Sequence, residues 1–295
     1  MNILTTEKRA AILTALAEGS GVNSTARMCQ CSKITVLRLL NDASAVCARW
    51  HDQHVRNLRA ERVQADEIWS YVGCKDKTRK AGASGVGSVW CWIGLDSDSK
   101  LVISYRLGWR EQADADSFMR DLASRVANRI QLTSDGLQHY EKAVVRSFGW
   151  NVDYGQTIKE YANPPRENAT TRYSPGVCIS CEKVRVIGQP IQEDISTSHV
   201  ERLNLSLRLS CKRYARLTMG FSRRLQNHLA ALNLNFWSYN WSKRHSALKT
   251  TPAVASGIAT RPMSMVELVE HIQAQEAAVG GRLTGYLPSP KAEPK

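Results

Sequence analysis

The sequence predicts an α/β protein in which an all-helical segment precedes a mixed five-stranded sheet flanked by helices. Up to about residue 60, apolar residues recur at the spacing of amphipathic helices, whereas from residue 61 short β-branched and aromatic runs alternate with helical ones. Of the 295 residues, 43% are hydrophobic, which is enough for a buried core. The expected divisions are residues 1–60, 61–250 and 251–295, the last comprising a C-terminal helix and a disordered tail.

The chain is strongly basic. Its formal net charge of +13 raises the local concentration of anions and favours polyphosphate partners. No apolar stretch approaches the ~20 residues that span a bilayer, and the N-terminus lacks the features of a secretory signal. We therefore expect a cytoplasmic protein with no membrane partner.

The eight cysteines are scattered along the chain and are expected to be reduced thiols. Only Cys178 and Cys181 have C-x-x-C spacing. The alternative use of this pair, a structural zinc site, would need a further ligand such as His199 or Cys211.

Two short helices and a third helix are predicted in residues 1–60. Residues 5–17 and 22–29 have helical patterns, and Ser32 suits the N-cap of a third helix. Two helices joined by a tight turn are typical of a helix-turn-helix, in which early exposed positions of the last helix meet base edges or phosphates in the major groove. The residues at these positions are Lys33, Thr35 and Arg38. The alternative is a plain three-helix cap whose charges are solvated.

Beyond residue 61 the predicted elements follow the order β-β-β-α-β-α-β. The strands are expected at 62–72, 89–95, 101–105, 130–133 and 154–158. The two helices are expected at 112–127 and 137–148. An antiparallel meander followed by alternating helices and strands gives a mixed sheet with helices on its faces.

Residues 162–197 contain several Pro and Gly residues and are expected to form an irregular insertion. Two helices are predicted to follow, at about 198–216 and 221–240, with Gly220 between them. The tail beyond Gly280 is expected to be disordered.

The predicted element order is that of the ribonuclease H-like fold. In that fold, carboxylates from the first strand, the end of the fourth strand and a later helix converge at one edge of the sheet. Asp66, Asp135 and Glu201 occupy these three places. Strand alternation puts Asp66 and Glu67 on opposite faces, so only one of them is expected to face a metal.

Each of the three acids also has a simpler interpretation. Asp66 could be an exposed strand residue, and Asp135 could belong to an ordinary turn with Gly136. Glu201 could complete a capping box with Ser198. The agreement of all three positions with one fold favours a shared site.

Such a group of carboxylates in a basic chain suggests a divalent-metal site that faces a polyanion. Cleavage or transfer of a phosphodiester needs charge neutralised on the attacking and leaving oxygens, which two Mg²⁺ ions about 3.5–4 Å apart achieve. Mg²⁺ prefers oxygen ligands and keeps several waters, so a few carboxylates suffice. Asp66 is predicted to bridge the two ions, Asp135 to hold one and Glu201 the other, with Mn²⁺ as a substitute.

The helix that carries Glu201 belongs to a basic segment. Between residues 200 and 250 there are ten Lys or Arg residues and one acid, which is Glu201. Surfaces usually mix charges of both signs, so a track for DNA phosphates explains this segment better than a solvated face. Glu201, Asn204, Arg208 and Lys212 are expected on one stripe of the helix. The residues expected to position phosphates are Arg202, Asn204 and Arg208, with Lys212 further along the track.

Four segments carry a resemblance to a known family. Residues 66–72 (Asp-Glu-Ile-Trp-Ser-Tyr-Val), 132–136 (Leu-Thr-Ser-Asp-Gly) and 195–205, with Val200-Glu201-Arg202-Leu203-Asn204, resemble DDE transposases. Residues 239–248, followed by Thr251-Pro252-Ala253, resemble the segment that closes many transposase and integrase cores. Within the DDE transposases, these segments most resemble the insertion-sequence-one family.

This resemblance implies a helix-turn-helix that binds terminal inverted repeats and a core that performs Mg²⁺-dependent strand cleavage and transfer. It implies double-stranded DNA partners, both element ends and target, and homo-oligomers on DNA in a cytoplasmic, nucleoid-associated protein. Some relatives begin with a zinc-binding finger, whereas this chain begins with the predicted helix-turn-helix. By position, Cys178 and Cys181 do not replace that finger.

Two other functions stay open at the level of sequence. One is a non-catalytic DNA-binding repressor derived from a transposase, although the three intact carboxylates argue against it. The other is a ribonuclease H-like nuclease that cuts DNA without joining it. The helix-turn-helix pattern favours sequence-directed DNA but does not separate these functions.

Overall fold

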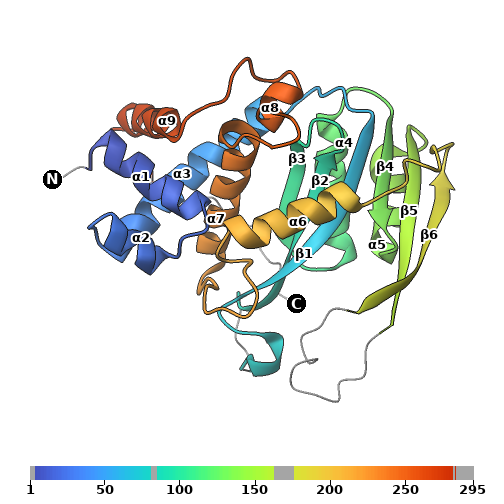
Figure 1. Cartoon of the computed structure of the whole chain (residues 1–295), viewed down its shortest axis with the longest axis horizontal. Coiled ribbons are helices and arrows are strands. Elements are labelled where there is room, and N and C mark those ends of the chain that lie inside the picture. The colour runs from blue at the N-terminus through green and yellow to red at the C-terminus, as the bar shows by residue number, and fades with distance from the viewer. Residues whose placement is uncertain (1–3, 81–84, 163–175, 282, 284–295) are drawn as a thin grey trace.

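The fold is that of a computed structural model, which describes residues 4–80, 85–162, 176–281 and 283. The predicted disordered tail lies almost entirely outside the described residues. Figure 1 shows the N-terminal helices on one side of the molecule and the sheet on the other. Among the described residues, no helix is both long and apolar enough to cross a membrane.

A mixed sheet forms the centre of the larger part, with its strands in the order β3-β2-β1-β4-β5-β6. The strands are β1 (Arg62–Val72), β2 (Gly87–Asp96), β3 (Val102–Gly108), β4 (Ile130–Asp135), β5 (Val152–Ala162) and β6 (Val177–Ile187). The pairs β1–β4 and β4–β5 are parallel, and the other pairs are antiparallel. The first five strands therefore have the order and directions expected of the ribonuclease H-like fold.

The sixth strand corrects the sequence-based prediction of five strands. It also replaces part of the irregular insertion predicted at 162–197, of which residues 163–175 lie outside the described residues and residues 188–197 contain no helix or strand. Strand β6 pairs with a β5 that is longer than predicted, and together they form the edge of the sheet. Most of β6 is exposed, so its residues show little of the apolar alternation that reveals a half-buried strand. Its hydrogen bonds to β5, rather than burial, define it.

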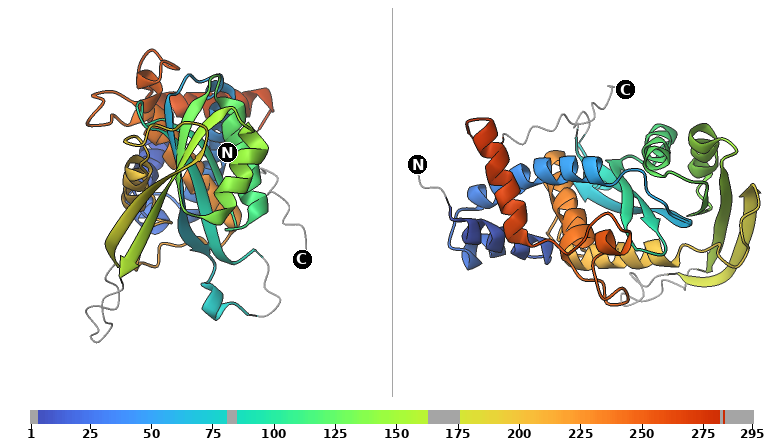
Figure 2. Two further views of the ribbon diagram at one scale, coloured as in Figure 1. Left: turned by 90° about the vertical axis from the view of Figure 1, so that its right-hand side faces the viewer. Right: turned by 90° about the horizontal axis from the view of Figure 1, so that it is seen from above.

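Helices cover both faces of the sheet (Figure 2). Helices α4 (Gln112–Arg125) and α5 (Gln138–Phe148) pack on the face that carries Trp92. Helices α6 (Ser198–Ser210) and α7 (Leu225–Trp237) pack on the opposite face, which carries Cys91 and Ile93. Successive residues of β2 thus enter two different cores, as strand alternation requires.

The three predicted N-terminal helices are present as α1 (Thr6–Ala17), α2 (Val22–Met28) and α3 (Lys33–His54). The Ser32 hydroxyl accepts a hydrogen bond from Thr35 N–H at 3.0 Å, so the predicted N-cap of α3 is confirmed. The second half of α3 packs against α7, and the helix continues to His54. One hydrophobic core runs from Ile12 to Leu132, so these helices and the sheet share it, and the division at residue 60 stays a prediction.

The C-terminal segment returns to the N-terminal helices. Helix α9 (Met265–Ala278) packs on α1, and the guanidinium of Arg9 donates two 2.8 Å hydrogen bonds to the carboxylate of Glu276. Helix α9 lies within residues 251–295, where a C-terminal helix is expected. The short elements are η1 (Asp76–Thr78), the π-helical turn η2 (Ser238–Ser242) and α8 (Pro252–Ala255).

Helix α6 lies along β1 and is held there by polar contacts. The buried Gln64 side chain accepts hydrogen bonds from the backbone N–H groups of His199 (2.9 Å) and Val200 (3.1 Å), and so caps the start of α6. At the other end, the Ser70 hydroxyl donates to the backbone carbonyl of Arg213. Gln64, Asp66 and Ser70 share one face of β1, so α6 is aligned with the strand that carries the first acid.

Candidate active site

A cavity of about 670 Å³ opens beyond the carboxyl end of β4. Its walls come from β1, β5 and α6, from the turn after β4, and from Arg110 in the β3–α4 loop. The acidic lining residues are Asp66, Glu67, Asp135 and Glu201. The basic ones are Arg110, Lys159 and Arg208. The cavity lies at the carboxyl ends of parallel strands, where ligands of open α/β sheets commonly bind.

Three acids form a tight group in this cavity. One carboxylate oxygen from each of Asp66, Glu67 and Asp135 lies within 4.8 Å of the other two. The structure thus brings together Asp66 and Asp135, as the sequence predicts, and adds Glu67. In the part of the chain that the structure describes, no other group of three acidic, His or Cys ligands has this geometry.

The presence of Glu67 contradicts the expectation that only one of the neighbouring acids faces the site. The two residues do start on opposite faces of β1, since Asp66 pairs with Ile93 and Glu67 with Trp92. However, the last β1–β4 pair is Ala65 with Ser134. Beyond it no strand separates the two faces on this side of β1, so both carboxylates reach the end of β4.

Glu67 is held rigidly from the α4–α5 face. Its side chain is only 2% exposed, and it accepts hydrogen bonds from Arg110 (2.7 and 2.9 Å) and from the Tyr140 hydroxyl (2.9 Å). The guanidinium of Arg110 also lies 4.7 Å above the ring centroid of Trp90. Arg110 and Tyr140 are far from Glu67 in sequence, which is why their contacts with it do not show in the sequence pattern.

A buried aspartate positions the loop that carries Arg110. The Asp114 carboxylate accepts from Trp109 N–H at 2.6 Å and from Arg106 Nε at 2.8 Å. A Cβ on Gly108 would lie 2.4 Å from this carboxylate, so a larger residue there would push it away. Gly108 and Asp114 therefore fix the backbone from which Arg110 reaches Glu67.

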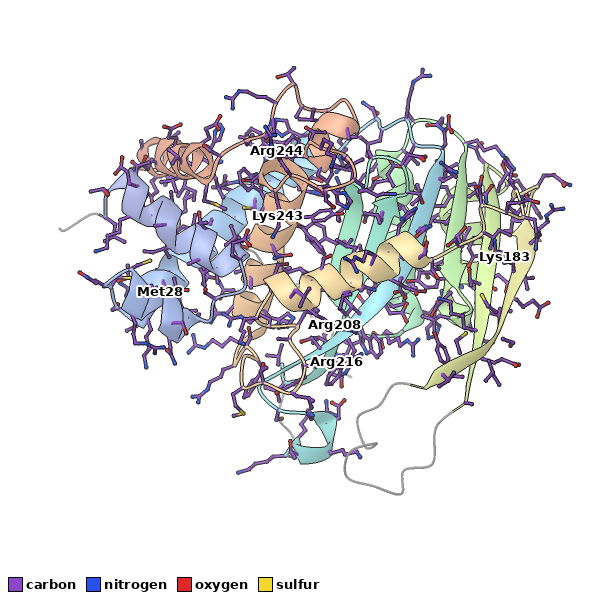
Figure 3. The ribbon with its side chains drawn as sticks, in the orientation of Figure 1. Met28, Lys183, Arg208, Arg216, Lys243 and Arg244 are labelled. Carbon is purple, nitrogen blue, oxygen red and sulfur yellow. The ribbon has the colours of Figure 1, made fainter. Side chains whose placement is uncertain are left out.

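Asp66 is oriented from the opposite face by α6. Asn204 Nδ2 donates to Asp66 Oδ2 at 2.6 Å. The Asn204 carbonyl oxygen is buried, and no donor reaches it within the described structure. Arg208 lies one turn further along α6, and its pKa is lowered by burial and by the nearby charge of Arg216 (Figure 3).

Glu201 lines the same cavity but is not a member of the tight group. It is 45% exposed, its carboxylate is paired with Lys159, and it accepts a hydrogen bond from the Thr197 hydroxyl. Thr197 is the N-cap of α6 and makes no side-chain capping bond, so the capping-box interpretation with Ser198 is wrong. The residue is therefore available to the cavity rather than committed to the helix start.

The crowded carboxylates disfavour their own ionised forms. Burial and the charges of Glu67, Asp135 and Glu201 raise the pKa of Asp66 to about 8. Burial and Asp135 raise the pKa of Glu67 to about 7, although Arg110 and Tyr140 oppose the shift. Burial also raises the pKa of Asp135, while its hydrogen bond from Leu137 N–H acts in the other direction. A bound cation would relieve this repulsion.

The chemistry of these donors fits a hard divalent cation. All are carboxylate oxygens. Mg²⁺ and Mn²⁺ prefer oxygen ligands, whereas zinc sites usually include His or Cys. The donor set is therefore suited to Mg²⁺ and unsuited to structural zinc.

No family model matches the chain, and the comparison with curated proteins found no match. A cryo-EM structure of the piggyBac transposase synaptic complex with hairpin DNA has 11% identity and a TM-score of 0.44, covering 99% of this chain and 75% of that one. The Mos1 transposase paired-end complex with the left transposon end has 12% identity and a TM-score of 0.21, covering 52% and 60%. The Mos1 strand transfer complex has 13% identity and a TM-score of 0.23, covering 81% and 78%. The functional inference for this chain rests on its own acidic cavity.

Two residues of the predicted phosphate track lie outside this cavity. Helix α6 ends at Ser210 rather than near 216, so Lys212 is not on the stripe that carries Glu201, Asn204 and Arg208. Lys212 instead lines a small crevice beside Ser20. Arg202 lies on the other side of α6, in a separate cavity. Only Asn204 and Arg208 of the predicted track contact the acidic cavity.

The predicted groove-reading residues lie on the first turns of α3, away from the acidic cavity. Lys33 and Arg38 are exposed, and Thr35 is half-buried. The Thr35 hydroxyl lies 2.9 Å from the Ser32 hydroxyl, so it supports the N-cap. A DNA-reading role for these three residues stays a prediction.

The cysteines show no sign of a zinc site in the described residues. All eight are free thiols. Cys178 and Cys181 are exposed on β6, and neither belongs to a group of three ligands. Cys211 is buried at the end of α6. The reduced-thiol interpretation fits these positions.

Proposed function

We propose that this chain is a DDE transposase of the insertion-sequence-one type, which cleaves DNA at the ends of a mobile element and joins them to a target. The observation that carries the proposal is the group of Asp66, Glu67 and Asp135 at the end of β4, in a ribonuclease H-like sheet beside a basic helix. Carboxylates so placed suit metal-assisted phosphodiester chemistry. The net charge of +13 suits a nucleic-acid substrate.

Asp66, Asp135 and Glu201 are assigned as the residues that would hold two Mg²⁺ ions. When bound, these ions would neutralise charge on the attacking and leaving oxygens of the scissile phosphodiester. Glu201 suits this role because it lines the cavity and nearly half of its side chain is exposed, and a bound ion would replace its ion pair with Lys159. Lys159 is then free to contact a phosphate of the substrate.

The other cavity residues orient the acids and the DNA. Asn204 holds one oxygen of Asp66, and Arg110 and Tyr140 hold Glu67. Glu67 is therefore assigned as a positioning residue whose charge adds to the attraction for cations. Arg208 is assigned to a phosphate of the strand being cut, since it lies one turn beyond Asn204 on the cavity side of α6.

The reaction has two steps of the same kind. Water attacks a phosphodiester at the element end, the P–O3′ bond breaks, and the element strand is left with a 3′-hydroxyl. That hydroxyl then attacks a phosphodiester of target DNA, and a second P–O3′ bond breaks. Recognition of the ends is assigned to α2 and α3, through Lys33, Thr35 and Arg38, in homo-oligomers assembled on DNA.

Cleavage of the native ends tests this proposal. The DNA that flanks the coding region is to be tested as substrate in Mg²⁺, Mn²⁺ or EDTA, with free 3′-hydroxyl ends as the readout. Wild-type protein is expected to cut in either metal, and Asp66→Asn is expected to abolish cutting while leaving DNA binding nearly intact. Asp98→Asn is a matched control, because Asp98 pairs with Arg62 and does not line the cavity.

The joining step is tested separately with a pre-cut end and a target plasmid. Joined products are expected with wild-type protein and Mg²⁺. Cutting without joining would replace the transposase assignment by a nuclease. Binding of the ends with neither reaction would leave a DNA-binding repressor.

A further inference from the structure

Helix α6 presents basic residues on two sides. Asn204 and Arg208 line the acidic cavity, whereas Arg202 lines a second cavity of about 480 Å³ on the other side of the helix. Figure 3 shows Arg208 and Arg216 on one side of α6, and Lys243 and Arg244 on the other. We refer to this second space as the reverse cavity.

The reverse cavity is built from three distant parts of the chain. Its wall includes the end of α1 at Glu18, the outer side of α6, and the segment that follows η2. That segment is held by backbone hydrogen bonds from Lys243 N–H to Ser238 (2.7 Å), from His245 N–H to Thr250 (2.8 Å) and from Lys249 N–H to His245 (2.9 Å). Its cationic side chains therefore extend from a fixed backbone.

The charges that line the reverse cavity do not balance. Glu18 is its one acidic lining residue, and it pairs with Lys243 at 3.1 Å. Arg202 and Arg244 are exposed, and no carboxylate pairs with either among the residues that the structure describes. Two unpaired guanidinium groups in one concave surface favour an anion, and guanidinium suits phosphate in particular.

One further cation, Lys100, lies near this cavity. Burial lowers the pKa of His245, and the charges of Lys100 and Arg202 lower it further. The Nδ1 atom of His245 is buried, and within the described structure it has no hydrogen-bond partner. The region thus carries a positive potential beyond its two free arginines.

We propose that the reverse cavity binds the phosphate backbone of DNA on the far side of α6 from the strand being cut. The inference rests on the proposed function, because it places α6 between two stretches of the same polyanionic substrate. The cations of the cavity come from two elements, α6 and the segment after η2, and such an extended arrangement suits a backbone of repeated phosphates. Arg202 and Arg244 would each contact one phosphate.

Salt dependence of binding tests this inference without any need for cleavage. The full chain is titrated with a short duplex carrying the element end, in EDTA and over a series of KCl concentrations. Each cation that contacts a duplex phosphate adds about 0.9 to the slope of log K against log[salt]. Arg202→Ala/Arg244→Ala is therefore expected to reduce the magnitude of this slope by about 2.

Matched variants separate this effect from a general loss of charge. Arg120→Ala/Lys142→Ala removes two exposed cations from α4 and α5, on the other face of the sheet, and is expected to keep the wild-type slope. Arg202→Lys/Arg244→Lys keeps both charges and is also expected to keep it. Circular dichroism checks that every variant is folded. An unchanged slope in the folded Arg202→Ala/Arg244→Ala variant overturns the inference.

A small phosphate-containing anion could use the same chemistry, and pyrophosphate is the probe for it. Pyrophosphate could raise the melting temperature of wild type but not of Arg202→Ala/Arg244→Ala, while both proteins have the same slope of log K against log[salt] for DNA. In that case the cavity binds a small anion and the DNA inference is overturned. Failure of the proposed function has a different signature. Wild-type protein would then not cut DNA in Mg²⁺, whatever the slopes measured in EDTA.

Discussion

Three carboxylates that share one small space make the acidic cavity sensitive to pH. The ordinary pKa of an aspartate is 3.8, and that of Asp66 is raised to about 8 by burial and by its acidic neighbours. Between these values the unfolded chain has lost the proton and the folded chain keeps it. The contribution of Asp66 to stability is therefore fully present below about pH 4 and is lost as the pH rises toward about 8.

Replacement of Asp66 by Asn should reveal this loss directly. In EDTA, the free energy of unfolding of Asp66→Asn relative to wild type is expected to rise between about pH 4 and pH 8, because Asn cannot ionise. Thermal or urea unfolding over this range measures the difference, with Asp98→Asn as control. A difference that does not change with pH would contradict the assigned repulsion.

Metal binding is expected to act through the same carboxylates. Since Mg²⁺ requires ionised ligands, it should raise the melting temperature of wild type more at pH 8 than at pH 5. Asp66→Asn should lose most of this increase, and Asp98→Asn should keep it. Differential scanning calorimetry with Mg²⁺ and with EDTA provides the comparison, and equal increases in both variants would argue against a metal site here.

Glu67 and Glu201 are expected to differ in what they support. Glu67→Gln removes a buried charge whose pKa is raised to about 7, so its stability relative to wild type is expected to rise as the pH rises through about 7. Glu201→Gln alters an exposed residue, so stability should change little while cleavage is lost. Unfolding and cleavage assays on both variants test this division. If Glu201→Gln cleaves normally, Glu67 rather than Glu201 is the third metal ligand.

At the scale of elements, the placement of α6 depends on the side chain of Gln64. Gln64→Leu keeps a side chain of similar size but leaves the N–H groups of His199 and Val200 without their acceptor. A loss of about 1–3 kcal/mol is expected from these unsatisfied donors. Urea unfolding measures it, and Gln53→Leu, at an exposed position of α3, serves as control. Equal stability of the two variants would mean that α6 is held by its apolar face alone.

In the proposed function, helix α3 reads the sequence of the element end. Arg38→Ala is expected to weaken binding to the element end by about tenfold and to reduce discrimination against unrelated DNA. Arg120→Ala, on α4, is the control. Binding assays at one fixed salt concentration measure both effects. If Arg38→Ala retains both affinity and discrimination, α3 does not read the groove.

Much of the architecture could be predicted from the sequence, because helices α1 to α5 and strands β1 to β5 have clear periodicity or caps. The end of α6 could not, since residues 211–216 have no helix breaker. There the burial of Tyr214 and the hydrogen bond from Ser70 to Arg213 stop the helix through tertiary contacts. Strand β6 was missed because its exposed residues lack a buried face.

The acidic cavity could be predicted only in part, for a related reason. Asp66 and Asp135 follow from the strand order, since parallel neighbours bring their carboxyl ends together. Strand alternation predicts that Glu67 faces away from the cavity. That prediction ignores that β4 ends beside Glu67, so no strand there separates the two faces of the sheet. Its partners Arg110 and Tyr140 lie 43 and 73 residues away, so only the fold reveals them.

At the scale of the whole molecule, the N-terminal helices and the sheet share one hydrophobic core. Helix α7 packs on α3 and lies beside α6 on the sheet, and α9 closes the N-terminal bundle through Arg9 and Glu276. The start of α3 and the acidic cavity are thus joined by packed elements rather than by a linker. They are expected to move as one body.

That rigidity would keep the distance between the start of α3 and the acidic cavity constant. A protein that read a sequence with the start of α3 and cut with the acidic cavity would always break the strand at a constant number of base pairs from the motif it had recognised. The position of each element end relative to its motif would then be defined to the nucleotide by the dimensions of the protein.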